Sequence, residues 1–211
     1  MSEVIGVFGH IGSGKSHFSK LISEHYLYEY LDCDKIFKEQ IIPNELFRKS
    51  VTKLFKQIDV EPYVNDKWNV NELKQVLFIN ESITEEFNDI VRTFLNPILQ
   101  EYIRNNDRVL IEMATLPMNP IKYLCDKLFF VGYVSESPMD VVHVVRKRNP
   151  ELTEEYIVRV LNYQIGLYTD NTMDDYEKCY SMGNTKFIES RNYSDNWNTN
   201  EHLLEQFRAS F

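Results

Sequence analysis

The chain has 211 residues, of which 43% are hydrophobic, so it can bury one substantial core but is short for two complete and independent domains. Its formal net charge of -9 argues against the broad basic surface that binds nucleic acid or anionic lipid. The three cysteines lie far apart and no run approaches 18 apolar residues. We therefore expect reduced thiols, a cytoplasmic protein, and neither nucleic acid nor membrane as a partner.

Five short apolar segments, bounded by glycine or charged residues, are typical of buried strands. They are residues 4–8, 27–31, 109–111, 128–134 and 186–188. Amphipathic helical patterns lie between them, at residues 16–25, 44–56, 70–79, 83–104, 138–148 and 154–168. Asparagine-rich stretches near 60–72 and 192–200 are typical of surface loops. The alternation predicts an α/β fold with a five-stranded parallel sheet flanked by helices.

The span 44–106 is mainly helical and lies between the second and third predicted strands. We therefore expect residues 1–43 and 107–211 to form the core, with 44–106 as a helical insertion over the sheet edge. In that position the insertion would bind the acceptor substrate and set its specificity.

Residues 9–16 read Gly-His-Ile-Gly-Ser-Gly-Lys-Ser, which fits the phosphate-loop (P-loop) pattern between a strand and a helix. The glycines permit positive φ and a close backbone approach, so that successive N–H groups can surround a phosphate. Lys15 would bridge the β- and γ-phosphates of ATP, and the Ser16 hydroxyl would bind Mg²⁺. The predicted nucleotide-binding residues here are Gly9, His10, Ile11, Gly12, Ser13, Gly14, Lys15, Ser16 and His17. The position of His10 would let it touch a phosphate, but the simpler expectation is that its side chain faces solvent.

Acidic residues follow two of the predicted strands, where the carboxyl ends of parallel strands bind ligands. Asp34 is suited to accept a proton from an attacking hydroxyl, or to cap the following helix. For Asp32, helix capping and ordering of Mg²⁺ are equally good interpretations. Glu112 ends another apolar strand, where it would order a Mg²⁺-bound water or remain a solvated strand-end residue.

The segments 11–16 and 31–36 resemble the two most recognisable motifs of the dephospho-coenzyme A kinase family, at about the right separation. Thinner similarity continues at residues 73–78, 95–98 and 146–164. The resemblance implies a P-loop kinase fold with a lid at about 146–170, a general base at Asp34, and use of ATP with Mg²⁺. It also implies that Arg146 and Arg148 close over the ATP phosphates and that Asn192 lies near the adenine site.

The similarity is weakest in the part of the chain that we expect to bind the acceptor substrate. Asn71 and Asn96 stand where this family usually has Arg and His, and residues 112–118 replace its Asp-x-Pro-Leu-Leu-x-Glu segment. A small-molecule kinase that phosphorylates the 3′-hydroxyl of dephospho-coenzyme A is the leading interpretation. A nucleoside or (deoxy)nucleoside monophosphate kinase and a non-catalytic nucleotide-binding regulatory module are the alternatives. A GTP switch is disfavoured because the sequence has no Asn-Lys-x-Asp motif.

Overall fold

The computed structural model of the protein describes residues 2–132, 138–168, 185–190 and 198–211. The chain divides into two compact units, one formed by Met1–Asp32 with Tyr102–Phe211 and the other by Cys33–Glu101. The sequence placed these boundaries at 43/44 and 106/107. The second unit begins earlier because the ring of Phe37 packs against Phe47, Trp68 and Phe87 of that unit, at centroid distances of 5.7, 6.0 and 6.2 Å.

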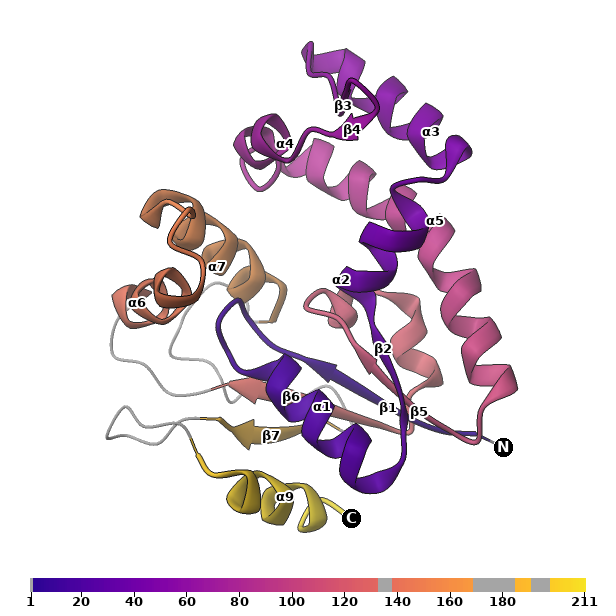
Figure 1. The fold of residues 1–211 in the computed structure, drawn as a ribbon, viewed down its shortest axis with the longest axis vertical. Coiled ribbons are helices and arrows are strands. Elements are labelled where there is room, and N and C mark those ends of the chain that lie inside the picture. The colour runs from indigo at the N-terminus through magenta and orange to yellow at the C-terminus, as the bar shows by residue number, and fades with distance from the viewer. Residues whose placement is uncertain (1, 133–137, 169–184, 191–197) are drawn as a thin grey trace. The chain divides into compact units, whose positions relative to one another are not determined.

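The first unit contains a five-stranded sheet in the order β2-β5-β1-β6-β7, with every pair of neighbours parallel (Figure 1). Its strands are β1 (Glu3–Phe8), β2 (Glu29–Asp32), β5 (Arg108–Glu112), β6 (Lys127–Gly132) and β7 (Thr185–Glu189). This confirms the predicted α/β fold with a parallel sheet. Val7 pairs with Glu112 on one side and with Phe129 on the other, so the carboxyl ends of β5, β1 and β6 meet at one edge.

Helices α1 (Lys15–Tyr26) and α9 (Asn200–Arg208) pack on one face of this sheet (Figure 1). Side chains alternate along β1, so Ile5 and Val7 join their apolar residues in a common core. On the opposite face, Gly6 lies against the 3₁₀ helix η3 (Leu116–Met118), which is followed by η4 (Pro120–Leu124). Among the residues that the structure describes, two more helices of this unit are α6 (Pro138–Arg148) and α7 (Glu154–Tyr168), which we call the lid hairpin.

The strand predicted at 27–31 begins two residues later than expected. Leu27 ends α1 with a left-handed φ of 58°, and the amide of Tyr28 donates to the Ser23 carbonyl as a helix cap. The strand predicted at 128–134 begins at Lys127 and is described only to Gly132. Helix α9 was not predicted, although Thr199 caps it by accepting from the amide of His202.

The second unit is mainly helical and has an aromatic core. Its elements are α2 (Cys33–Ile36), the π-helix η1 (Phe37–Ile41), α3 (Glu45–Phe55), the 3₁₀ helix η2 (Lys56–Ile58), β3 (Tyr63–Val64), β4 (Lys67–Trp68), α4 (Val70–Val76) and α5 (Glu81–Asn105), which ends in the first unit. The loop predicted at 60–72 contains an unexpected hairpin, because Asn65 and Asp66 both adopt positive φ, at 49° and 61°. Two such residues form the tight turn that suits antiparallel strands. No helix in the described residues combines the length and apolar composition needed to span a membrane.

Candidate active site

The P-loop (residues 9–16) connects β1 to α1 at the carboxyl edge of the sheet. Gly12 and Gly14 adopt positive φ of 76° and 88°, conformations that side chains disfavour, and Gly14 is the N-cap of α1. A Cβ added to Gly9 would lie 2.2 Å from the Val131 carbonyl oxygen of β6. The loop therefore needs glycine at all three positions, two for φ and one for close backbone approach.

The first turn of α1 begins at Lys15, and Ser16 and His17 follow it. The first N–H groups of any helix have no intrahelical acceptor, and together with the helix dipole they favour an anion. Lys15 adds a cation at this end. His17 is exposed and its Nε2 lies 2.8 Å from Oδ1 of Asn200 on α9. The structure thus brings Lys15, Ser16 and His17 together at a helix terminus suited to phosphate.

Glu112 is buried at the end of β5, with 6% of its surface exposed. Its Oε1 accepts a hydrogen bond of 2.6 Å from the Ser16 hydroxyl, and its Oε2 accepts one from the Tyr30 hydroxyl. Asp32 is its register partner on β2. Burial raises the pKa of Glu112, and the hydrogen bonds from Ser16 and Tyr30 and the charge of Lys15 offset part of that effect. The interpretation of Glu112 as a solvated strand-end residue was wrong.

The Ser16 hydroxyl and the Glu112 carboxylate already lie within hydrogen-bonding distance of each other. Hydroxyl, carboxylate and phosphate oxygens are the ligands that Mg²⁺ prefers, directly or through water. The residues at this point therefore fit Mg²⁺ bound together with a nucleotide.

His10 is buried within the P-loop, with 1% of its surface exposed, so the expectation that it faces solvent was wrong. Its Nδ1 lies 2.7 Å from the carbonyl oxygen of Ile11. A carbonyl only accepts, so Nδ1 carries the proton in this contact. Burial lowers the pKa of His10 to about 4, and the nearby Lys15 charge acts in the same direction. His10 is consequently neutral at pH 7, and its ring donates a hydrogen bond to the backbone of the loop.

The lid hairpin packs on the P-loop through apolar side chains. Val141, Val145 and Ile157 belong to a buried cluster of the hairpin, and Ile11 of the loop packs against that cluster. A Cβ on Gly12 would lie 2.8 Å from Cγ2 of Val145.

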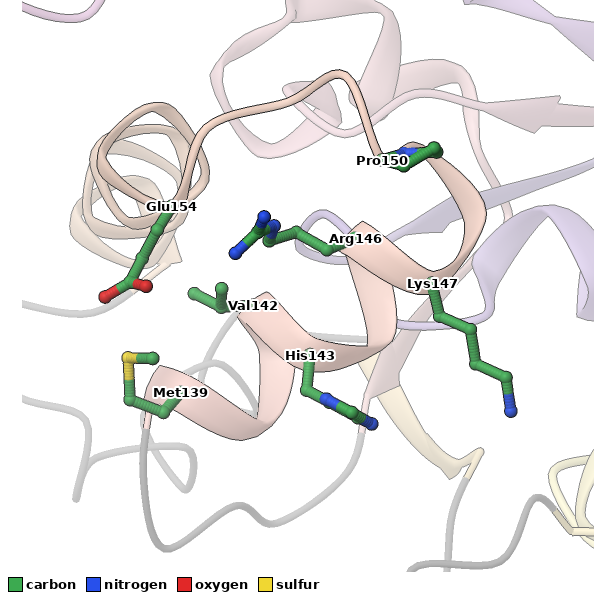
Figure 2. A pocket seen from close by; sticks show the side chains of 7 residues that line it. All are labelled: Met139, Val142, His143, Arg146, Lys147, Pro150 and Glu154. Atoms are coloured by element: carbon green, nitrogen blue, oxygen red, sulfur yellow. The ribbon is translucent and has the colours of Figure 1, made fainter.

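The cationic side chains of the lid lie mainly on its surface. Arg146 and Arg148 are exposed, and Arg159 forms an ion pair of 2.7 Å with Glu155 one turn earlier on α7. Arg146 lines a cleft of about 540 Å³ on the hairpin and points into it from α6, while Glu154 borders the cleft from α7 (Figure 2).

Two polar residues that were not among the predicted site residues hold the P-loop from other elements. Oε1 of Gln164, on α7, accepts a 2.6 Å hydrogen bond from the Ile11 amide. The buried Ser190 hydroxyl, just after β7, lies 2.5 Å from the Ser13 carbonyl oxygen and 2.9 Å from that of Gly132. Gln164 belongs to the segment 146–164 that resembles the lid of the family, whereas nothing local marked Ser190.

A family model described as dephospho-CoA kinase matches residues 3–174. The chain belongs to the dephospho-CoA kinase family. A dephospho-CoA kinase of Staphylococcus epidermidis is 25% identical over 180 residues, covering 83% of this chain and 85% of the relative. One from Staphylococcus aureus is 26% identical over 180 residues, covering 83% and 84%. The resemblance carried by residues 11–16 and 31–36 is thereby confirmed, and the chain belongs to a family of phosphotransferases.

Solved structures share the fold. The structure of TT1252 from Thermus thermophilus has a TM-score of 0.69 at 18% identity, with 99% of this chain and 95% of that chain covered. A dephospho-CoA kinase from Campylobacter jejuni has a TM-score of 0.51 at 15% identity, with 99% and 97% covered. The M. mycoides deoxyadenosine kinase with bound dATP has a TM-score of 0.50 at 13% identity, covering 98% and 97%. These likenesses support the predicted P-loop kinase fold.

The other predicted site residues of this family member are distributed as follows. Asp32 is the last residue of the N-terminal segment of the first unit, and Asp34 is an exposed residue of α2 in the second unit. Asn192 lies outside the described residues. Asn96 is half-buried on α5, and the changed segment 112–118 continues from β5 into η3, where Leu116 is fully buried.

Proposed function

We propose that this chain transfers the γ-phosphoryl group of ATP to the 3′-hydroxyl of dephospho-CoA. The observation that supports this most is a complete P-loop, with Ser16 bonded to Glu112, in a chain of the dephospho-CoA kinase family. We also propose that the protein works in the cytoplasm on small molecules, as its scattered cysteines, its lack of a long apolar run and its acidic charge led us to expect.

In this proposal the P-loop amides and the N-terminus of α1 hold the ATP phosphates, with Lys15 against the β- and γ-groups. Ser16, Glu112 and Asp32 would hold Mg²⁺, directly or through water. Mg²⁺ bound there would neutralise charge on the transferred group. Tyr30 keeps the Glu112 carboxylate directed at Ser16, because its hydroxyl occupies the other carboxylate oxygen.

Asp34 accepts the proton of the acceptor hydroxyl while that oxygen bonds to the γ-phosphorus. The bond between this phosphorus and the β–γ bridging oxygen breaks, and ADP leaves. Arg146 and Arg148 stabilise the charge on the transferred group, and the lid excludes water that would otherwise compete as acceptor. The second unit supplies the acceptor pocket.

The direct test measures ADP release by the full chain with Mg²⁺·ATP and one acceptor at a time. Dephospho-CoA, each nucleoside and each nucleoside monophosphate serve as acceptors. We expect dephospho-CoA to accelerate ADP release at least about 100-fold over the Lys15→Ala variant, because Lys15 stabilises the transferred charge. Lys20→Ala, which alters an exposed lysine of the same helix, is the matched control and should behave as the unmodified protein.

If only a nucleoside or a nucleotide accelerates ADP release, the protein is still a kinase, but its acceptor is not dephospho-CoA. If no acceptor raises ADP release above the Lys15→Ala background, the kinase proposal is wrong.

A further inference from the structure

The P-loop has two sides with different hydrogen-bonding partners. On the side that continues into α1, the amides of Ser16 and His17 belong to the first helical turn and have no helical acceptor. On the other side, the loop is bonded to protein: the Ser13 amide donates to the His10 carbonyl, and the Ile11 amide donates to Gln164. We call Ile11 and Gly12 the crest of the loop.

Gln164 reaches the crest from the lid helix α7, 153 positions along the chain. Only 9% of its surface is exposed, and its bond to the Ile11 amide is short at 2.6 Å. The contact is partly buried, so an Ile11 amide that lost its acceptor would keep part of the cost of its desolvation. The bond is therefore retained only while α7 and the crest stay in this register.

A second contact reinforces the same junction. The Ile11 side chain packs against the apolar cluster of the lid hairpin, and Gly12 lies where an added Cβ would come within 2.8 Å of Val145 on α6. Both helices of the hairpin thus meet two successive residues of the loop. The polar bond from Gln164 gives this otherwise apolar contact a fixed direction and register.

We infer that Gln164 is a positioning residue that ties the placement of the lid hairpin to the conformation of the P-loop crest. It leaves the first-turn amides of α1 open to phosphate while holding the opposite side of the loop in place. Lid placement and triphosphate binding are then coupled through one hydrogen bond. Any effect of Gln164 on the rate of phosphoryl transfer rests on the proposed kinase function. Its effects on the loop and on ATP binding do not.

The test compares the intact protein with Gln164→Met and Gln164→Glu. Methionine keeps the volume and removes the acceptor, and glutamate keeps an acceptor oxygen. The direct readout is hydrogen exchange of the Ile11 amide, measured by NMR without nucleotide. We expect exchange about tenfold faster in Gln164→Met and restored protection in Gln164→Glu, with the amide of Leu110 in β5 unchanged.

ATP affinity, measured by calorimetry, is the second readout. We expect the dissociation constant to rise about three- to tenfold in Gln164→Met. Asn162→Met, at an exposed position on the same helix, is the control and should change neither readout. If Gln164→Met fails to fold by circular dichroism, Gln164→Asn takes its place, because it withdraws the acceptor by one methylene.

Unchanged Ile11 exchange in the variant that lacks the acceptor would overturn the inference. Faster exchange with unaltered ATP affinity would overturn the coupling to nucleotide. Both readouts remain valid if no acceptor is ever phosphorylated, so failure of the kinase proposal is seen separately, as absent ADP release by the unmodified protein.

Discussion

Acidification should destabilise the protein through the buried His10. Its folded-state pKa is about 4, against an ordinary value of 6.5, because burial disfavours the charged ring. Between these two values the unfolded chain binds the proton and the folded chain does not. The free energy of unfolding therefore has its full value above pH 6.5 and falls as the pH is lowered towards 4. At pH 4 the loss due to His10 reaches about 3 kcal/mol.

At pH 5 the expected loss from His10 is about 2 kcal/mol, a large part of the stability of an ordinary domain. The assay is urea unfolding at pH 7.5, 6 and 5 on the unmodified protein and on His10→Asn. Asparagine places an N–H donor near the position of Nδ1, so the bond to the Ile11 carbonyl can persist while the titrating ring is removed.

The carboxylates titrate in both proteins, so the informative quantity is the difference between their unfolding free energies at each pH. That difference should shift by about 2 kcal/mol in favour of the variant between pH 7.5 and pH 5. His25→Asn, at an exposed position on α1, should show no such shift. A difference for His10→Asn that stays constant within about 0.5 kcal/mol would refute the reasoning.

Four further substitutions test separate parts of the protein. Tyr30→Phe removes the hydroxyl that donates to Glu112, so we expect about 1–2 kcal/mol lower stability in urea and a higher Mg²⁺ requirement for turnover; a variant equal to the unmodified protein in both would contradict this role. Gly12→Ala places a side chain at φ 76°, which costs about 1–2 kcal/mol and should weaken ATP binding in calorimetry. Gly166→Ala on α7, where an added Cβ meets nothing within 4 Å, should instead stabilise by about 0.5–1 kcal/mol, and equal effects of the two glycine variants would count against the strained loop. Asp34→Asn should lower kcat by roughly 10²–10⁴-fold in steady-state assays while the KM for ATP stays constant, and an unchanged kcat would remove Asp34 as the base.

The sheet and the P-loop were predictable because their signals are local. Residues 4–8 are apolar because β1 is central and covered on both faces, and Gly9, Gly12 and Gly14 have backbone requirements set within a few residues. The hairpin at Asn65 and Asp66 was missed for a related reason. Its turn signal is local too, but each strand has only two residues, too few to show an alternating pattern.

The environment of Glu112 could not be read from its own neighbourhood. Tyr30 pairs with Leu110 in the β2–β5 register, and its hydroxyl extends to Glu112, two residues further along β5. A diagonal reach of this kind depends on which strands are neighbours, and β2 and β5 are separated by the whole second unit. Sequence alone placed Glu112 at a strand end and left its burial open.

His10 shows how burial can reverse a prediction made from residue type. A histidine among glycines and serine in a loop is ordinarily expected at the surface. Here the loop is covered by the lid hairpin, and its backbone is held by Gln164 from α7 and by Ser190 from beyond β7. His10 lies within this covered loop, and 1% of its surface is exposed.

The shape of the phosphate site is consequently a property of the whole first unit, although its sequence signature occupies only residues 9–16. Local residues supply the amides, Lys15 and Ser16 that we propose to face the ligand. The opposite side of the loop is held by Gln164 and Ser190, which come from elements far along the chain. Because loop amides bind phosphate only when they converge, we expect a substitution at either of these residues to change nucleotide affinity without removing any group that is proposed to face the nucleotide.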